Sequence, residues 1–297
     1  MAGKVLVLGA SGMLGSTVFN VLSKYGGYDV TGTIRSESWR SFFPGHSAHR
    51  LISGMDIMDH DDLIQLLHTV KPDIIINCVG LVKQLNNAKD PLSVLPVNSL
   101  LPHRLNRLAN LVNARLIHIS TDCVFDGAKG GYTEADESNA IDLYGKSKYI
   151  GEVVDGIALT LRTSIIGHQL TGARSLIDWF LAQRGVVNGY SQAFFSGLPT
   201  DELARVIAEY VIPNQSLNGL YHVASTRIDK ESLLKIVAER YGHNVEIVAN
   251  TDLVIDRSLD ARRFGQATGY EAPDWPNLVS GMFRYREEMI EAGALQR

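Results

Sequence analysis

The sequence has little cysteine and no cluster of metal-binding side chains, and each shortage excludes a class of protein. Cys78 and Cys123 are the only two cysteines among 297 residues, and each lies inside an apolar run. A disulfide framework needs more cysteines and an oxidising compartment, so we expect two buried free thiols. No cysteines and histidines have the spacing of metal ligands, and we therefore assign no metal site.

Long apolar runs and a strong charge of one sign are also missing. No run has the length of a membrane span, and the first residues, MAGKVLVLGASG, hold only a short apolar stretch that glycines interrupt. We therefore expect a cytoplasmic protein with no signal peptide and no membrane contact. Lys and Arg number 28 against 32 Asp and Glu, a net charge of −4. Such a mild acidic balance creates no field that attracts nucleic acid, so we expect no nucleic-acid partner.

What the chain does contain is an alternation of short apolar runs and helical patterns. The runs KVLVLG (4–9), DIIINC (73–78), RLIHIS (115–120) and ALTLRTS (158–164) are continuous, and YDVTGTI (28–34) is rich in β-branched residues. Continuous apolar runs are typical of parallel strands that are covered on both faces. The alternation therefore predicts an α/β fold with a doubly wound parallel sheet of the Rossmann type.

The alternation loosens after about residue 166, which predicts two parts. We expect a dinucleotide-binding Rossmann domain over residues 1–165 and a smaller C-terminal α/β substrate-binding lobe over residues 166–297. Segments at about 200–225 are expected to return to the main sheet, because GLYHVAS is strand-like. The pattern DKESLLKIVAERYG predicts a further helix, with Asp229 as its N-cap.

A glycine-rich turn follows the first apolar run and opens a helical pattern. Its glycines form a G-x-x-G-x-x-G array in VLVLGASGMLGSTVF. Such a turn lets the backbone approach a diphosphate closely, and the helix N-terminus offers unpaired N–H groups and partial positive charge. We predict that this turn binds a dinucleotide through Gly9, Ser11, Gly12, Met13, Leu14 and Gly15.

The end of the second strand indicates which dinucleotide binds. Arg35 follows that strand directly, whereas Glu37 lies two residues further on. A carboxylate at the strand end would bind a ribose 2′-hydroxyl, but a guanidinium there pairs with a 2′-phosphate. We therefore predict NADP(H) as the preferred coenzyme and NAD(H) as the alternative.

An aspartate after the third apolar run offers a contact for the adenine. Asp56, followed by Ile57, could accept a hydrogen bond from the adenine amino group. A helix-capping role is an equal alternative for Asp56, and Asp59 or Asp61 could instead cap the next helix.

Three further residues have the chemistry of a carbonyl reductase. Thr121 comes at the end of the fifth strand, and Tyr144 precedes Lys148 by one helical turn. Hydride addition to a ketone creates an alkoxide that needs a proton, and a tyrosine with a pKa of about 10 is a poor acid–base group near neutrality. We expect Tyr144 to donate the proton, Lys148 to lower its pKa and hold the ribose, and Thr121 to orient the carbonyl.

The order of these motifs resembles the extended short-chain dehydrogenase/reductase family. The glycine array, NCVG (77–80), Asn98, STDCVFDG (120–127) and the tyrosine–lysine pair occur in the order of that family. Within it the chain is most similar to dTDP-4-dehydrorhamnose reductases, whose C-terminal signatures resemble GLPT and RSLDARRFGQATGYEAPDW here. The resemblance implies NAD(P)H-dependent reduction of a nucleotide-linked 4-keto-6-deoxy sugar for surface polysaccharide precursors, and we expect a homodimer.

The resemblance adds residues to the predicted site. On the coenzyme side these are Cys78, Val79, Gly80, Asn98, Thr163, Ser164 and Ile165. On the substrate side, beside Thr121, Lys83 and Gln84 could face the substrate, although a solvated loop is an equal alternative. Arg174, Arg257, Arg262 and Arg263 are candidates because the diphosphate of a nucleotide sugar needs cations. We expect His168 and His222 to be packing or surface residues.

Departures from the family pattern lie on the substrate side and leave alternatives open. Cys123 stands where a tyrosine is usual, and CVGLVKQLNNAKD differs from the usual segment after the fourth strand. A reductase of a UDP-linked keto-amino-sugar fits nearly as well. An epimerase or dehydratase is a further alternative, although dehydratases carry an acidic pair after the threonine and here only Asp122 is acidic. The last alternative function is that of a non-catalytic NADP-binding subunit, like the regulatory subunit of methionine adenosyltransferase.

Overall fold

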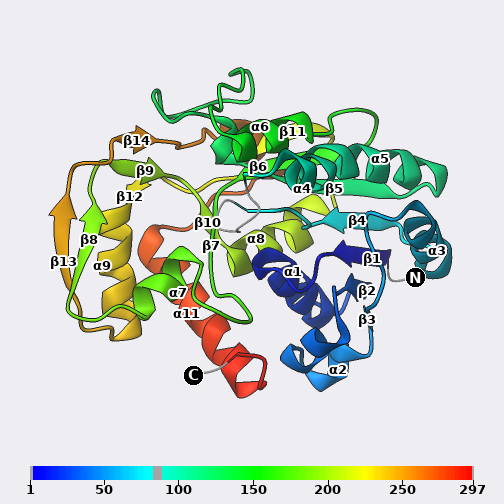
Figure 1. The fold of residues 1–297 in the computed structure, drawn as a ribbon, viewed down its shortest axis with the longest axis horizontal. Coiled ribbons are helices and arrows are strands. Elements are labelled where there is room, and N and C mark those ends of the chain that lie inside the picture. Colours follow the sequence, from blue (N-terminus) through cyan, green and yellow to red (C-terminus); the bar gives the residue numbers. More distant parts are fainter. Residues whose placement is uncertain (1–2, 83–88, 296–297) are drawn as a thin grey trace.

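A seven-stranded parallel sheet forms the centre of the computed structural model, which describes residues 3–82 and 89–295 (Figure 1). Its strands are Gly3–Leu8 (β1), Tyr28–Thr33 (β2), Leu51–Ile52 (β3), Ile74–Asn77 (β4), Arg115–Thr121 (β5), Leu159–Thr163 (β6) and Gly219–His222 (β11). They lie in the order β11-β6-β5-β4-β1-β2-β3, and every neighbouring pair is parallel. The order 3-2-1-4-5-6 is that of doubly wound dinucleotide-binding folds, which confirms the predicted fold class.

Helices cover both faces of this sheet. They are Met13–Lys24 (α1), His60–Val70 (α3), Leu101–Leu111 (α5), Leu143–Ile150 (α6) and Thr200–Val206 (α8). Val5 and Val7 of β1 pack in one buried cluster with α1 and α8, whereas Leu6 and Leu8 pack in a second cluster with α3 and α5. Because successive side chains of a strand point to opposite faces, a continuous apolar run serves both layers.

Side-chain caps start the helices where the sequence predicts. The Asp59 carboxylate accepts hydrogen bonds of 2.8 and 3.1 Å from the main-chain N–H groups of Asp61 and Asp62, so Asp59 caps α3. Asp229 accepts a bond of 2.8 Å from Ser232 N and caps helix α9 (Lys230–Tyr241), as expected. Each cap satisfies an N–H group that has no partner inside the helix.

Small sheets and helices of the last third lie beside the main sheet (Figure 1). The sheets are the pair β10-β7, the pair β13-β8 and the three-stranded β12-β9-β14. Their strands are Ile165–Ile166 (β7), Val186–Tyr190 (β8), Ala193–Phe195 (β9), Leu198–Pro199 (β10), Ile228–Asp229 (β12), Glu246–Asn250 (β13) and Ile255–Asp256 (β14). The helices are Leu176–Leu181 (α7), Arg262–Thr268 (α10) and Trp275–Glu291 (α11), besides α9.

Segments of the last third also complete the main sheet. Strand β11 is the edge strand next to β6, and α8 packs against α1. The division of the chain at residues 165 and 166 stays a prediction. Within the described ranges no helix is long and apolar enough to cross a membrane.

Shorter elements complete the chain. They are Glu37–Phe42 (η1, a 3-10 turn), Gly45–Ala48 (α2), Pro91–Leu95 (α4), Pro96–Leu100 (η2, a π turn), Asp122–Val124 (η3, a 3-10 turn) and Ile207–Val211 (η4, a π turn). Elements α4, η2 and α5 follow one another without a break and form one long helical segment between β4 and β5.

Candidate active site

The glycine turn joins β1 to α1 in the way that a diphosphate-binding turn requires. Gly9 has φ +82°, a value that residues with side chains rarely adopt, and its N–H donates to Thr33 Oγ1 at 3.1 Å. A Cβ on Gly15 would lie 2.1 Å from the carbonyl oxygen of Gly9. Glycine at both positions therefore lets the N-terminus of α1 approach the end of β1, where its N–H groups can face a bound anion.

A cavity of about 600 Å³ opens beside this turn, at the carboxyl ends of β1, β4, β5 and β6. The strand order reverses between β1 and β4, which is the position where open α/β sheets bind ligands. The structure brings fourteen of the predicted residues into the cavity wall. They are Gly12, Met13, Leu14, Cys78, Val79, Gly80, Thr121, Tyr144, Lys148, Thr163, Ser164, Ile165, Arg174 and Arg257.

Tyr144 and Thr121 lie together in this wall. Thr121 is buried at the end of β5, and both Thr121 and Tyr144 line the cavity. The Thr121 hydroxyl lies 3.1 Å from Asp122 Oδ1. Burial raises the pKa of Tyr144 above its ordinary value of 10.0, so the predicted lowering of this pKa is wrong. The phenol therefore holds its proton firmly at neutral pH, the form in which it can act as a donor.

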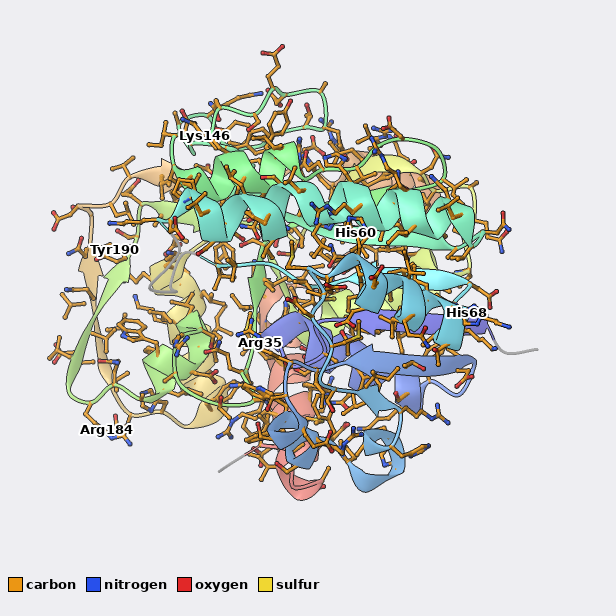
Figure 2. All side chains as sticks on the ribbon, turned by 45° about the vertical axis from the view of Figure 1, so that its right-hand side comes forward. Arg35, His60, His68, Lys146, Arg184 and Tyr190 are labelled. Carbon is orange, nitrogen blue, oxygen red and sulfur yellow. The ribbon has the colours of Figure 1, made fainter. Side chains whose placement is uncertain are left out.

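Lys148 is buried one turn further along α6. Its ammonium donates a hydrogen bond of 2.7 Å to the carbonyl oxygen of Ile119 in β5. Burial lowers the pKa of Lys148 to about 8. The Glu152 carboxylate has the opposite, smaller effect and raises this pKa. Lys146 on the same helix is instead exposed and projects outward (Figure 2). Lys146 and Lys148 are two residues apart on α6, and only Lys148 lines the cavity.

Asn98 supports the cavity wall from behind rather than lining it. It is fully buried; Oδ1 accepts from Leu81 N at 2.8 Å, and Nδ2 donates to Leu81 O at 3.0 Å and to Ser147 Oγ at 3.1 Å. These bonds fix the segment after β4 against helix α6. Contact between Asn98 and the coenzyme stays a prediction, since its described partners all belong to the protein.

The loop after β2 places Arg35 and Glu37 in different settings. Arg35 is exposed at the start of this loop (Figure 2). The Glu37 carboxylate is bound by Arg40, with one contact of 2.9 Å to Nη2, and by the Ser53 hydroxyl at 2.6 Å. The Arg40 guanidinium and the Ser53 hydroxyl hold the pKa of Glu37 at about 2. Glu37 is therefore engaged within the loop, while the guanidinium of Arg35 faces solvent.

The remaining predicted coenzyme contacts lie outside the cavity wall. Ser11 is half-buried in the glycine turn, and Gly9 and Gly15 lie beneath it. Asp56 is exposed and accepts from Met58 N at 2.9 Å, and Ile57 packs against the second buried cluster. Adenine contacts of Asp56 and Ile57 stay predictions.

The predicted substrate-side residues fall into three groups. Arg174 and Arg257 line the cavity. Arg262 does not: its side chain is 81% exposed and pairs with Asp260, and Arg263 stacks over the Tyr221 ring at 4.6 Å from the centroid. Lys83 and Gln84 lie outside the described residues.

The sequence reasoning missed several residues that line the cavity. Among them are Lys230, Phe194 and Gln169, which come from segments after β7. Lys230 follows the N-cap of α9, and Phe194 is the middle residue of β9. No local pattern marks either of them, because only the tertiary fold brings these segments to Thr121.

The histidines and cysteines have structural settings. His168 is buried between Asp178 Oδ1 at 2.5 Å and Tyr241 OH at 2.8 Å, as expected of a packing residue. Burial beside Arg162 lowers the pKa of His222 to about 4 and keeps it neutral. Neither Cys78 nor Cys123 is in a disulfide, and both are half-buried in the cavity wall. In the described part of the chain, no group of three or more acidic, histidine or cysteine side chains could hold a metal ion.

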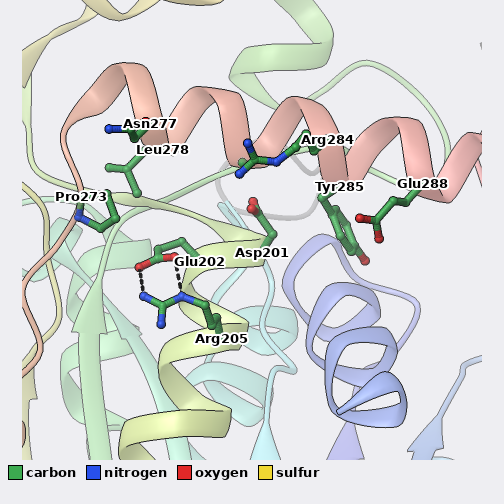
Figure 3. Close-up of a pocket in the computed structure, with 10 residues that line it drawn as sticks. Asp201, Glu202, Arg205, Pro273, Asn277, Leu278, Arg284, Tyr285 and Glu288 are labelled. Carbon is green, nitrogen blue, oxygen red and sulfur yellow. Dashed lines mark hydrogen bonds and ion pairs between the residues drawn. The ribbon is translucent and has the colours of Figure 1, made fainter.

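A second cavity of about 360 Å³ lies between α8 and α11 and holds none of the predicted residues. Figure 3 shows the Asp201 carboxyl directed toward α11, from which Arg284 and Tyr285 project. Asp201 Oδ1 is buried with no hydrogen-bond partner among the described residues, and burial raises the pKa of Asp201 to about 7. Glu202 is instead paired with Arg205 at 2.7 Å. The chemistry predicted from the sequence therefore belongs to the first cavity.

Comparison with protein families and known proteins gives concordant results. A family model described as RmlD substrate binding domain matches residues 3–252. A probable low-salt glycan biosynthesis reductase of Haloferax volcanii is 30% identical over 230 residues, 74% of this chain and 73% of the relative. A dTDP-4-dehydrorhamnose reductase of Aggregatibacter actinomycetemcomitans is 25% identical over 96% of this chain and 99% of its own length.

Two further comparisons extend this result. The methionine adenosyltransferase 2 subunit beta of Rattus norvegicus is 28% identical over half of this chain and 41% of its own length. Among solved structures, the dTDP-4-dehydrorhamnose reductase of Bacillus anthracis in complex with NADP matches with a TM-score of 0.79 at 20% identity, over 96% of this chain and all of that one. The structural likeness shows the fold, and the sequence matches confirm the resemblance inferred from the motifs.

Proposed function

The chain belongs to the RmlD substrate binding domain family, and on that premise we propose that it reduces a keto group of a nucleotide-linked sugar with NAD(P)H. The observation that carries this proposal is that Thr121, Tyr144 and Lys148 line one cavity together with the glycine turn. A hydroxyl, a phenol and an ammonium in one wall suit a carbonyl that becomes an alkoxide. The named reductases among the relatives support the same reaction.

The residues of the glycine turn fit a dinucleotide. A Cβ on Gly9 would lie 2.9 Å from Val79 Cγ2, and one on Gly15 would overlap the backbone of Gly9. Larger residues at these two positions would therefore distort the turn. When bound, the coenzyme supplies a hydride. Gly12, Met13 and Leu14, which line the cavity, would hold its diphosphate at the N-terminus of α1.

The protein's own residues would handle the oxygen of the substrate. We propose that Thr121 donates a hydrogen bond to the substrate carbonyl and positions it. Tyr144, which burial keeps protonated, would give its proton to the developing alkoxide. The positive charge of Lys148 would then stabilise the phenolate that remains. Thr163, Ser164 and Ile165 complete the wall on the β6 side and would hold the nicotinamide end.

The loop after β2 supports NADPH as the preferred coenzyme. The exposed guanidinium of Arg35 suits a 2′-phosphate, since arginine binds phosphate oxygens through paired N–H donors. Glu37, the nearest carboxylate, is bound to Arg40 and Ser53 and is poorly placed to bind a ribose 2′-hydroxyl. NADH remains the alternative coenzyme.

For the substrate we propose a dTDP-linked 4-keto-6-deoxy sugar, used in surface polysaccharide precursors. The relative from Aggregatibacter actinomycetemcomitans, which matches nearly end to end, supports this assignment. A UDP-linked keto-amino-sugar is the alternative substrate within the same reaction. An epimerase or dehydratase is less well supported, because Asp122 is followed by Cys123 rather than by a second acid.

A second candidate function is that of a non-catalytic NADP-binding subunit. Similarity to methionine adenosyltransferase 2 subunit beta over half of the chain favours it. The intact set of Thr121, Tyr144 and Lys148 in one cavity wall favours catalysis instead. Turnover separates the two functions directly.

The test is a panel of dTDP- and UDP-linked 4-keto sugars, with consumption of NADPH and of NADH followed at 340 nm. We expect at least one dTDP-linked 4-keto-6-deoxy sugar to be reduced, faster with NADPH than with NADH. A Tyr144→Phe preparation measured in parallel shows that the turnover belongs to this site. Binding of NADPH without reduction of any sugar in the panel would favour the subunit over the enzyme.

We further propose a cytoplasmic homodimer. Apolar side chains at Leu92, Leu100 and Ile150 are exposed on neighbouring helices, which supports an interface between two copies. Light scattering of the purified protein and fractionation of cells test the two statements separately; a monomer at micromolar concentration would contradict the first.

A further inference from the structure

Two cationic side chains that line the cavity follow the two outer strands of the β12-β9-β14 sheet. Phe194 in the central strand β9 is paired with Asp229 of β12 and with Asp256 of β14. The residues that follow these two partners are Lys230 and Arg257, and both line the cavity together with Phe194. The sheet thus delivers one cation from each outer strand to the substrate side.

Arg257 is fixed in place by the loop after β5. Its Nε donates to Phe125 O at 2.9 Å, and Nη2 lies 3.5 Å from Asp126 O. Nη1 lies 3.8 Å from the sulfur of Cys123. These contacts orient the guanidinium next to the turn that carries Thr121, so little conformational freedom remains to be lost on binding.

Lys230 has a different setting. It is the first residue of α9 and is only half-exposed, yet its ammonium has no hydrogen-bond or ion-pair partner within residues 3–82 and 89–295. The charged groups that act on it are Asp122 and Arg257, which line the same cavity. Burying part of a cation that has no bonding partner costs free energy, and binding of an anion beside it would offset that cost.

The fixed charges of this region do not balance. Asp122 is the one acidic residue among the described residues that line this cavity; it is buried, and its Oδ1 accepts a hydrogen bond of 3.1 Å from Thr121 Oγ1. One carboxylate therefore stands against Lys230 and Arg257, which leaves an excess of positive charge beside Thr121. Phosphate or carboxylate oxygens would neutralise this excess.

We propose that Lys230 and Arg257 form an anion-binding subsite that takes the diphosphate of the nucleotide sugar, with Lys230 as its specificity-determining cation. This inference rests on the proposed function, which requires a nucleotide-linked substrate. A diphosphate suits the pair because it offers oxygens to a fixed guanidinium and to a flexible ammonium at once. A carboxylate on the sugar ring has the same chemistry and is the other source of such an anion.

Binding of nucleotides to the NADP⁺-saturated protein tests the subsite without turnover. The probes are dTDP, UDP, uridine and UDP-glucuronate, measured by titration calorimetry on wild type, Lys230→Met and Lys230→Arg. We expect Lys230→Met to weaken dTDP or UDP at least tenfold and Lys230→Arg to retain affinity within about threefold, because it keeps the charge. Affinity should also depend less on ionic strength in Lys230→Met than in wild type.

The matched control is Lys235→Met on the same helix. Lys235 is 59% exposed and pairs with Glu231 at 2.6 Å, away from the cavity. This variant should bind dTDP and UDP like wild type. All variants should bind NADP⁺ with unchanged affinity, since Lys230 lies on the substrate side.

Each remaining outcome overturns a defined statement. If wild type binds NADP⁺ but neither dTDP nor UDP, the nucleotide-sugar function itself is wrong. If wild type binds them and Lys230→Met binds equally well, only the subsite is wrong; a lower melting temperature of that variant would then make Lys230 a counter-ion of Asp122. If Lys230→Met loses affinity for UDP-glucuronate alone, the anion is a sugar carboxylate and the diphosphate assignment is overturned.

Discussion

The ammonium nitrogen of Lys148 lies 2.7 Å from the carbonyl oxygen of Ile119, and this hydrogen bond ties helix α6 to strand β5. Thr121 ends that strand, and Tyr144 lies in the first turn of that helix. One buried contact between a side chain and the backbone therefore sets the relative position of the two elements that carry the proposed chemistry.

Replacing Tyr144 by phenylalanine should lower the rate of ketone reduction by a factor of about 10² to 10⁴, because the alkoxide loses its proton donor. NADPH should still bind, since the ring remains in the cavity wall. Tyr149→Phe is the control, because Tyr149 lies on the same helix but is 46% exposed. Stopped-flow traces of single turnovers separate chemistry from coenzyme binding. Near-normal turnover in Tyr144→Phe would remove its assigned role.

Replacing Lys148 by methionine should weaken NADPH binding and lower the reduction rate, because the buried charge beside Ile119 is lost while the volume is kept. Lys146→Met is the matched control, since Lys146 lies on the exposed face of the same helix. Fluorescence titration with NADPH gives the affinity of each variant. Equal losses in both variants would point to damage of α6 rather than to a role for Lys148.

The pH dependence of reduction should follow the charge of Lys148. Burial lowers its pKa to about 8, so the ammonium is present below that pH and is lost as the pH rises through it. The rate should therefore be full near neutrality and fall above about pH 8. In Lys148→Arg the guanidinium stays charged, and any remaining activity should extend to higher pH. A wild-type rate that stays constant up to pH 10 would contradict this assignment.

Replacing Arg35 by alanine should weaken NADPH binding roughly tenfold or more, because a charged contact to the 2′-phosphate is lost. NADH binding should change little. Arg184→Ala is the control, as Arg184 is exposed elsewhere on the molecule (Figure 2). Dissociation constants for both coenzymes decide the matter, and equal losses for NADPH and NADH would end the case for a phosphate contact at Arg35.

Replacing Asp201 by asparagine should stabilise the fold at alkaline pH. The folded-state pKa of about 7 lies above the ordinary value of 3.8. Between these two pH values Asp201 is therefore protonated in the folded chain and ionised in the unfolded chain. The free energy of unfolding of wild type should therefore decrease as the pH rises from about 4 to 7. At pH 8 the variant should be more stable by about 1–3 kcal/mol, the cost of an unsatisfied buried group.

Urea unfolding at pH 4.5 and pH 8 measures this difference. The difference in the free energy of unfolding between Asp201→Asn and wild type should be small at pH 4.5 and large at pH 8. Asp155→Asn, at an exposed position, should show no such difference. A difference that is independent of pH would mean that Asp201 does not carry the proton.

Much of the main sheet could be predicted from local patterns. Continuous apolar runs such as 73–78 mark strands that serve two layers, and β1 shows why, since Val5 and Leu6 enter different clusters. The caps at Asp59 and Asp229 follow from single side chains. Helix α11 was missed, although Asp274 caps it and a proline lies in its first turn; its packing against α8 and α9 is a tertiary feature.

Parts of the site were predictable for the same reason. The glycine turn and the Tyr144–Lys148 spacing are local features of one segment each, and both reach the cavity wall. The direction of the Tyr144 pKa was not predictable, since it depends on burial by segments distant in the sequence. The role of Asn98 toward Leu81 and Ser147 likewise depends on three segments meeting.

The sequence by itself determined the strand–turn–helix unit around Gly9 and the helix that carries Tyr144 and Lys148, because periodicity, glycine and capping act over a few residues. Only the tertiary structure decided that Lys230, Phe194 and Arg257 face Thr121. Three short strands from separate parts of the chain meet in β12-β9-β14 to place them there. Desolvation and charge in the cavity depend on that meeting, and no local pattern records it.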